Sequence, residues 1–233
     1  MIALLKRTFE QLSRQQDDYS YVAEAIVWLE MRGLPGLESV IDCLPELHAC
    51  ELRRAEPTAN ETLIKEYDAG NNSLLTTANS VVDAAIAGAT NAATFHATVH
   101  NCTQQFAIVP ELCRYSREGH AALAWWRDEA ADVHVVMSTA STPNPDYWQL
   151  PGETAKQLDQ RTLMLECSTD AELLRANIPE ARATISSGDF AERHEFCLLN
   201  GIEIDAQHYR LCCEVADKIL VESTDASRDG AGE

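Results

Sequence analysis

The chain lacks the long apolar run that a membrane-spanning helix requires. No stretch of its 233 residues approaches the roughly 18 to 20 apolar residues that cross a bilayer. The apolar start, Met1 to Leu5, is interrupted by Lys6, Arg7 and Glu10 too early for a secretory signal. These absences predict a soluble, cytoplasmic protein with no membrane partner.

Motifs that hold phosphate or present a serine nucleophile are also missing. The sequence contains neither G-x-G-x-x-G nor G-x-x-x-x-G-K-[ST], and it has no G-x-S-x-G elbow. On motifs alone we therefore predict no cofactor and assign no catalytic residue.

Basic residues are scarce. Eighteen Lys and Arg stand against 37 Asp and Glu, which gives a formal net charge of −19. Such a surface repels phosphate backbones, so we predict no nucleic-acid partner. The acidity is typical of a soluble bacterial protein; the alternative is that an acidic face meets a basic protein partner.

The eight cysteines include no C-x-x-C pair, which argues against a common zinc or redox unit. In a reducing compartment they are expected to be buried, inert thiols rather than disulfides. Only Cys113, beside Arg114, stands in a mildly electropositive setting that a nucleophile needs. The cysteines are Cys43, Cys50, Cys102, Cys113, Cys167, Cys197, Cys212 and Cys213.

The stretch from Ser73 to Cys102 organises the rest of the chain, because it predicts a small-residue helix that leads directly into a strand. The fold class is therefore α/β or α+β, with a mixed β-sheet flanked by helices and a helical N-terminal segment. We expect residues 1–54 to form that segment, 55–222 the sheet core and 223–233 an irregular tail, all in one compact unit. Alternation of helix and strand from Thr62 to Ser138 favours some parallel pairing.

Periodicity and breaker residues place the individual elements. Helices are predicted at 2–14, 21–32 with Ser20 as its cap, 37–52 with a bend near Pro45, from Asn79 or Ser80 to about 91, at 110–117, 170–176 and 205–218. Strands are predicted at 62–67, 94–99, 121–127, 133–138, 162–167 and 192–199. Residues 15–19, 55–60 and 139–152 are expected to be breaks or loops, and 181–188 strand or loop.

Histidine and cysteine side chains on and after the 94–99 strand are candidate metal ligands. His96, His100 and Cys102 fall on one face of the strand, and His134 lies on another strand, so imidazole and thiolate could hold zinc. A plain polar face of the sheet explains the same pattern without a fourth ligand or an H-E-x-x-H unit. We therefore predict no metal site.

The tail from Thr224 to Gly232 is the other candidate for binding. Ser227 and Arg228 together could grip a carboxylate or phosphate, with the flanking glycines admitting backbone N–H groups. A frayed terminus has the same composition.

Three segments carry a resemblance to known families. The segment Glu24 to Leu37 (EAIVWLEMRGLPGL), the central helix–strand unit and the ending Glu214 to Gly232 resemble an uncharacterised bacterial family of unknown function. Its pattern is W-L-x-x-R-G-L-x-G-L near the start and S-R-x-G-A-G at the end. This resemblance implies no activity.

More remotely, the order of elements is similar to that of the type-2 malate/L-lactate dehydrogenases, which use a nicotinamide cofactor. Those enzymes carry R-G-x-D-S-H-G after an N-terminal helix and N-S-x-H after a central strand. Here the same places hold Leu37 and Gln104, the latter in Asn101-Cys102-Thr103-Gln104. Since neither side chain can move a hydroxyl proton, the resemblance implies the architecture without that activity.

Two functions follow as hypotheses. The first is a non-catalytic binding or accessory-subunit protein, with a protein partner or a second copy of itself. The alternative is an oxidoreductase-like enzyme acting on a small anionic metabolite such as a 2-hydroxy or 2-keto acid. Asn101, Gln104, Ser227 and Arg228 would then contact the ligand, and His96, His100 or His120 would be the first candidates for an acid or base.

Overall fold

The computed structural model describes residues 1–12, 16–49, 56–60, 64–89, 94–152 and 158–219. Its α-helices are α1 (Ile2–Leu12), α2 (Gln16–Glu30), α3 (Leu37–Ala49), α4 (Leu74–Ala89), α5 (Ile108–Ser116), α6 (Ala171–Arg175), α7 (Ser187–Asn200) and α8 (Ala206–Ala216). The strands are β1 (Glu56–Asn60), β2 (Ile64–Asp68), β3 (Thr94–His100), β4 (Ala121–Arg127), β5 (Val133–Ser138), β6 (Asp146–Leu150) and β7 (Leu163–Ser168). Short 3₁₀ turns, η1 (Gln105–Ala107) and η3 (Asp217–Ile219), adjoin α5 and α8.

One seven-stranded sheet forms the centre, in the order β1-β2-β3-β7-β4-β5-β6. Among the described strands, β2 and β3 pair in parallel and every other neighbouring pair in the sheet is antiparallel. The mixed sheet confirms the predicted fold class, and the β2–β3 pair is the expected parallel contact.

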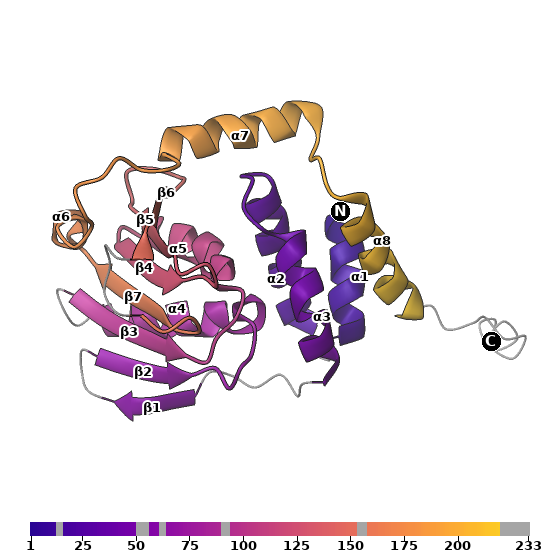
Figure 1. The fold of residues 1–233 in the computed structure, drawn as a ribbon, viewed down its shortest axis with the longest axis horizontal. Coiled ribbons are helices and arrows are strands. Elements are labelled where there is room, and N and C mark those ends of the chain that lie inside the picture. Colours follow the sequence, from indigo (N-terminus) through magenta and orange to yellow (C-terminus); the bar gives the residue numbers. More distant parts are fainter. Residues whose placement is uncertain (13–15, 50–55, 61–63, 90–93, 153–157, 220–233) are drawn as a thin grey trace, which may run out of the picture.

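Helices cover both faces of the sheet. One core cluster includes Phe95 and Trp126 with residues of α4, α5 and the N-terminal helices, while a second includes Trp125 and Leu174 of α6. Neighbouring residues of a strand point to opposite faces, so Trp125 and Trp126 enter different cores. Both are buried. Figure 1 shows α1, α2 and α3 beside the sheet, with α8 against α1 and α7 crossing above.

The predicted helix–strand unit between Ser73 and Cys102 is present, but its helix begins earlier than predicted. Helix α4 begins at Leu74, because Ser73 Oγ accepts a hydrogen bond from the N–H of Leu75 at 3.1 Å and serves as the cap. Asn79 and Ser80 therefore lie inside the helix and do not cap it. Along β3, Phe95, Ala97 and Val99 are buried, as the alternation predicts.

Several other boundaries were predicted incorrectly. Helix α2 begins at Gln16, inside the expected break at 15–19, and β1 occupies 56–60, where a loop was expected. The predicted loop 139–152 contains β6. The predicted strand 192–199 belongs to helix α7, which begins with a capping box between Ser186 and Asp189.

β4 and β5 lie at their predicted bounds, and the other elements differ from prediction by a few residues. Helix α3 runs through Pro45 and is described to Ala49, and α5 begins at Ile108, directly after η1. Asp170 and Asp205 cap α6 and α8 as the sequence indicates. No helix among the described residues is long and apolar enough to cross a membrane.

Candidate functional site

The loops that follow the parallel strands β2 and β3 lie side by side at one edge of the sheet. The carboxylate of Asp68 joins them, since its Oδ1 accepts hydrogen bonds from Asn101 Nδ2 at 3.0 Å and from the Gly70 N–H at 2.8 Å. These bonds, the Asn101 one first, lower the pKa of Asp68. The two strand ends are thus tied together by a charged group on the surface.

Backbone strain is concentrated in the same loops. Asn71, Asn101 and Gln104 have φ values of 64°, 53° and 50°, in the left-handed region. Asparagine adopts this region more readily than other non-glycine residues, so the strain is at Gln104. The strain is held by cross-loop bonds, from Thr103 N to Asn72 O at 3.3 Å and from Leu74 N to Thr103 O at 2.9 Å. Strained backbone that its surroundings hold in place is a common feature of binding sites.

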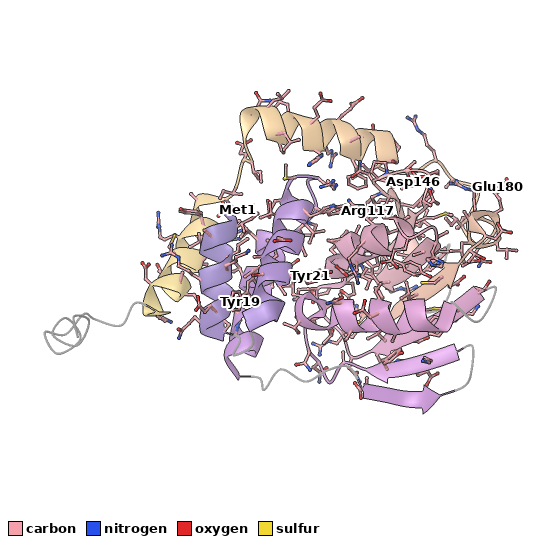
Figure 2. The ribbon with its side chains drawn as sticks, turned by 180° about the vertical axis from the view of Figure 1, so that it is seen from behind. Met1, Tyr19, Tyr21, Arg117, Asp146 and Glu180 are labelled. Carbon is pink, nitrogen blue, oxygen red and sulfur yellow. The ribbon has the colours of Figure 1, made fainter. Side chains whose placement is uncertain are left out.

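Gln104 turns the chain from β3 into η1 and α5. Its side-chain Oε1 is buried and has no hydrogen-bond partner among the described residues. A buried acceptor left unpaired costs about 1–3 kcal/mol. The same holds for the phenolic oxygen of Tyr21 on α2, a helix that packs against η1. Figure 2 shows Tyr21 on the side of α2 that faces α4 and α5.

Phe106, two residues after Gln104, covers a cluster of aromatic rings that the sequence analysis missed. Its ring centroid lies 5.0 Å from that of Trp126, 5.3 Å from that of His134 and 6.1 Å from that of Tyr147. Trp126 and His134 stack at 5.3 Å with nearly parallel planes. The cluster brings β4, β5 and β6 together beneath η1.

Within this cluster, acid–base groups form a hydrogen-bonded chain. His134 Nδ1 is 2.8 Å from Tyr147 Oη, and His134 Nε2 is 2.9 Å from Asp128 Oδ2. Burial, followed by the charges of Asp128 and Asp132, raises the pKa of Tyr147 to about 12. Such a chain can hold or pass a proton in a site that excludes water.

Among the described residues, no group of three or more His, Cys, Asp or Glu side chains could hold a metal ion. Two strands, β7 and β4, separate β3 from the β5 strand that carries His134. His134 is level with Val99 in the sheet and three spacings of about 4.8 Å away, so it is at least about 14 Å from His96 and His100. Cys102 is buried, and burial raises its pKa to about 12.

The other candidates lie apart from this edge or outside the described residues. Burial raises the pKa of Cys113 to about 11, so it is an inert core thiol. His120 stacks on Tyr115 at 4.7 Å, just before β4 begins at the opposite edge of the sheet. Ser227 and Arg228 fall outside the described residues. Leu37 is buried, and its N–H donates to Glu30 Oε1 at 2.6 Å.

Solved structures of dehydrogenases match this arrangement along nearly its whole length. A dehydrogenase from Sinorhizobium meliloti has a TM-score of 0.70 at 11% identity, covering 93% of this chain and 97% of its own. Malate dehydrogenase from Pyrococcus horikoshii has a TM-score of 0.69 at 11% sequence identity, and the match covers 95% of this chain and 94% of that enzyme. Sulfolactate dehydrogenase from Methanocaldococcus jannaschii has a TM-score of 0.61 at 10% sequence identity, and the match covers 94% of this chain and 95% of that enzyme. The chain shares their fold.

No family model matches the chain, and neither does any curated protein. The resemblance to an uncharacterised bacterial family therefore stays a prediction. The architecture implied by the more remote resemblance is confirmed, since the structural neighbours are malate- and lactate-dehydrogenase-like proteins.

Proposed function

We propose that this chain is an oxidoreductase-like protein that binds a small anionic metabolite, such as a 2-hydroxy or 2-keto acid, at the Gln104 end of β3. One observation carries the proposal: in a fold shared with malate, lactate and sulfolactate dehydrogenases, the chain keeps a buried, unpaired acceptor in a strained loop there. The stability lost to an unpaired buried group is recovered when a ligand hydroxyl donates to it.

The candidate ligand contacts take distinct roles under this proposal. Gln104 Oε1 accepts from the ligand, and Asn101 stays bonded to Asp68, so it shapes the loop more than it binds. Ser227 and Arg228 stay proposed contacts for the carboxylate. The resemblance implies a nicotinamide cofactor, which supplies hydride transfer when bound; its carboxamide N–H groups also fit the free acceptor of Gln104.

Oxidation of a hydroxy acid also needs a group that takes the hydroxyl proton. The histidines of the resembling enzymes are replaced by Leu37 and Gln104, so another group must do this. We assign the task to the chain of Asp128, His134 and Tyr147, which lies beneath Phe106 at the same edge.

Replacing Gln104 with leucine is expected to raise stability and remove ligand binding together. The substitution deletes a buried unpaired polar group, so the free energy of unfolding should rise by about 1 kcal/mol in urea titrations. The rise in melting temperature that the wild type shows with millimolar NADH, NADPH, malate or lactate should disappear, since binding stabilises by mass action.

Gln207→Leu is the matched control, because Gln207 is exposed at the start of α8. It should leave both stability and ligand response unchanged. If the wild type shows no shift with any of these ligands, the proposed function is wrong.

Tyr147→Phe tests the proton chain separately from binding. Removing the hydroxyl breaks the 2.8 Å contact with His134 but keeps the ring. Ligand-induced shifts should persist, while turnover in a nicotinamide absorbance assay falls by about 10²–10⁴-fold, the usual contribution of general acid–base catalysis. Turnover equal to that of the wild type would rule out this proton route.

A non-catalytic partner protein is the second candidate function. The last turns of α7 expose Phe196, Leu198 and Leu199, with 64%, 66% and 78% of their surface open to solvent. A hollow of about 590 Å³ on the adjoining α8 is lined in part by Ile204, Tyr209 and Cys213. Sedimentation compares the mass of the wild type in solution with that of the double variant Leu198→Glu/Leu199→Glu. A smaller species in the variant supports this function, and a monomer in both proteins contradicts it.

A further inference from the structure

A group of basic residues gathers where α2, α5 and α7 meet. Arg32 follows the end of α2, Arg117 follows the end of α5, and Arg193 and His194 lie on α7. Figure 2 shows Arg117 between α2 and the helices on the sheet, below α7. This concentration of positive charge is unexpected in a chain with a net charge of −19.

Arg32 forms the floor of the group. It is 5% exposed, and its guanidinium stacks on the Trp28 ring at 3.9 Å from the ring centroid. Nε donates to Asn144 Oδ1 at 2.8 Å and Nη1 donates to Trp28 O at 3.2 Å. A guanidinium carries five N–H donors, and no described residue accepts from Nη2. Burial, with a smaller contribution from the charge of Arg117, lowers the pKa of Arg32 to about 10.

Arg193 is fixed directly above this floor. Its Nη1 donates to Arg32 O at 3.1 Å and passes over Gly33. A β-carbon at Gly33 would lie 2.9 Å from that nitrogen, and the φ of +68° there also requires glycine. The backbone is thus shaped to let the Arg193 side chain reach Arg32.

Acidic partners for these arginines are missing among the described residues. None of the described ion pairs involves Arg32, Arg117 or Arg193. The carboxylate of Asp189 accepts hydrogen bonds from the N–H and the hydroxyl of Ser186 in the cap of α7. These bonds, and to a smaller extent the charge of Arg193, lower the pKa of Asp189. A buried charge without a counter-ion is costly, so the group is stabilised when an anion arrives from solution.

We propose that Arg32, Arg117 and Arg193 bind a small oxyanion, the carboxylate or phosphate group of a metabolite. The planar guanidinium matches both groups in a two-pronged contact. Arg32 supplies Nη2 from below, and the exposed Arg117 and Arg193 close over the anion. His194, half-buried beside Arg32, adds a neutral N–H donor.

This site is separate from the Gln104 loop. Tyr21 lies near the start of α2 and Arg32 just beyond its end, roughly 16 Å apart at about 1.5 Å per residue. The inference therefore does not rest on the proposed function, and Gln104→Leu should leave it intact.

The test titrates the full-length chain with inorganic phosphate and, separately, with malonate, by calorimetry at constant ionic strength. The double variant Arg117→Gln/Arg193→Gln changes only exposed side chains, so it should fold as the wild type does. We expect its affinity to fall by about tenfold for each arginine removed, as for the loss of one charge-assisted hydrogen bond. Arg117→Lys/Arg193→Lys should recover part of the affinity.

Arg7→Gln is the matched control, because Arg7 is exposed on α1 and the charge change is of the same kind. It should bind as the wild type does. Binding of phosphate alone supports a phosphate ligand, and binding of malonate alone a carboxylate. Absence of binding by the wild type, or equal affinity in all variants, overturns the site. If the double variant does not fold, the single variant Arg117→Gln is judged by the same outcomes.

Discussion

Trp126→Ala is expected to lower the free energy of unfolding by about 3–5 kcal/mol, the usual cost of removing a buried large aromatic side chain. Trp126 is 1% exposed, stacks on His134 and meets the edge of Phe106. Its loss leaves a cavity where η1 covers the sheet, so His134 and Tyr147 lose the surface that orients them. Urea unfolding measures the stability, and the histidine side-chain signal in NMR reports on His134.

Trp125→Ala separates these two consequences. Trp125 is 2% exposed and packs in the core on the other face of the sheet, with Leu158 and Leu174. Its truncation should cost a similar free energy while leaving the His134 signal and any response to ligands unchanged. A loss below about 1 kcal/mol for Trp126→Ala, or the same His134 change in both variants, would contradict the role given to the Trp126 face.

Strands in the interior of the sheet were predictable from local sequence. Residues 133–138 (VHVVMS) and 94–99 (TFHATV) are rich in β-branched and apolar side chains, and β5 and β3 are found there. β4 was predicted at its observed bounds, Ala121–Arg127. In these segments local preference and tertiary burial favour the same structure.

The strands at the rims of the sheet were missed for the opposite reason. β1 contains Pro57, and β6 directly follows a segment with Pro143 and Pro145, so both segments read locally as loop. An edge strand tolerates proline because one side of it needs no ladder bonds. Antiparallel pairing with the strand next to them in the chain, β2 for β1 and β5 for β6, decides such strands, and the proline-rich composition of each segment hides that pairing.

Helix α7 was mistaken for a strand although a signal was present. Ser186 and Asp189, three residues apart in the sequence, form a capping box, in which each side chain accepts a hydrogen bond from the backbone N–H of the other. A pair with this spacing is a signal for the start of a helix. The apolar residues Phe196, Leu198 and Leu199 do not follow helical spacing toward a core, because they face solvent. Apolar periodicity therefore failed where the helix has almost no buried face.

The candidate site was predictable only in its loop. Asn101 and Gln104 follow a recognisable strand, so their place at its end could be read from the sequence. The contacts of His134 with Tyr147 and Asp128 depend on how β5 pairs with β6 and on the turn before β5. Likewise, Arg32, Arg117 and Arg193 are brought together by three helices far apart in the chain. Convergence of that kind follows from topology, which single residues do not encode.

Phe190→Ala is expected to release α7 from the body of the protein. Phe190 is fully buried in the main core and is the buried residue of this helix, whose other side chains are half-buried or exposed. Truncating a buried phenylalanine costs about 3–5 kcal/mol when the whole fold must absorb it. Here detachment of α7 is the cheaper response, so local opening limits the loss. Amide exchange along 187–200 should accelerate by orders of magnitude, while β4 and β5 stay protected.

Phe196→Ala is the matched control on the same helix, because Phe196 is 64% exposed and its truncation should change stability by less than about 0.5 kcal/mol. Release of α7 also carries Arg193 away from Arg32, so phosphate or malonate binding should weaken in Phe190→Ala but not in Phe196→Ala. Uniform acceleration of exchange across the whole chain would show instead that α7 and the sheet unfold as one unit. The burial of Phe190 thus fixes α7 on the protein and, through Arg193, holds the proposed anion site together.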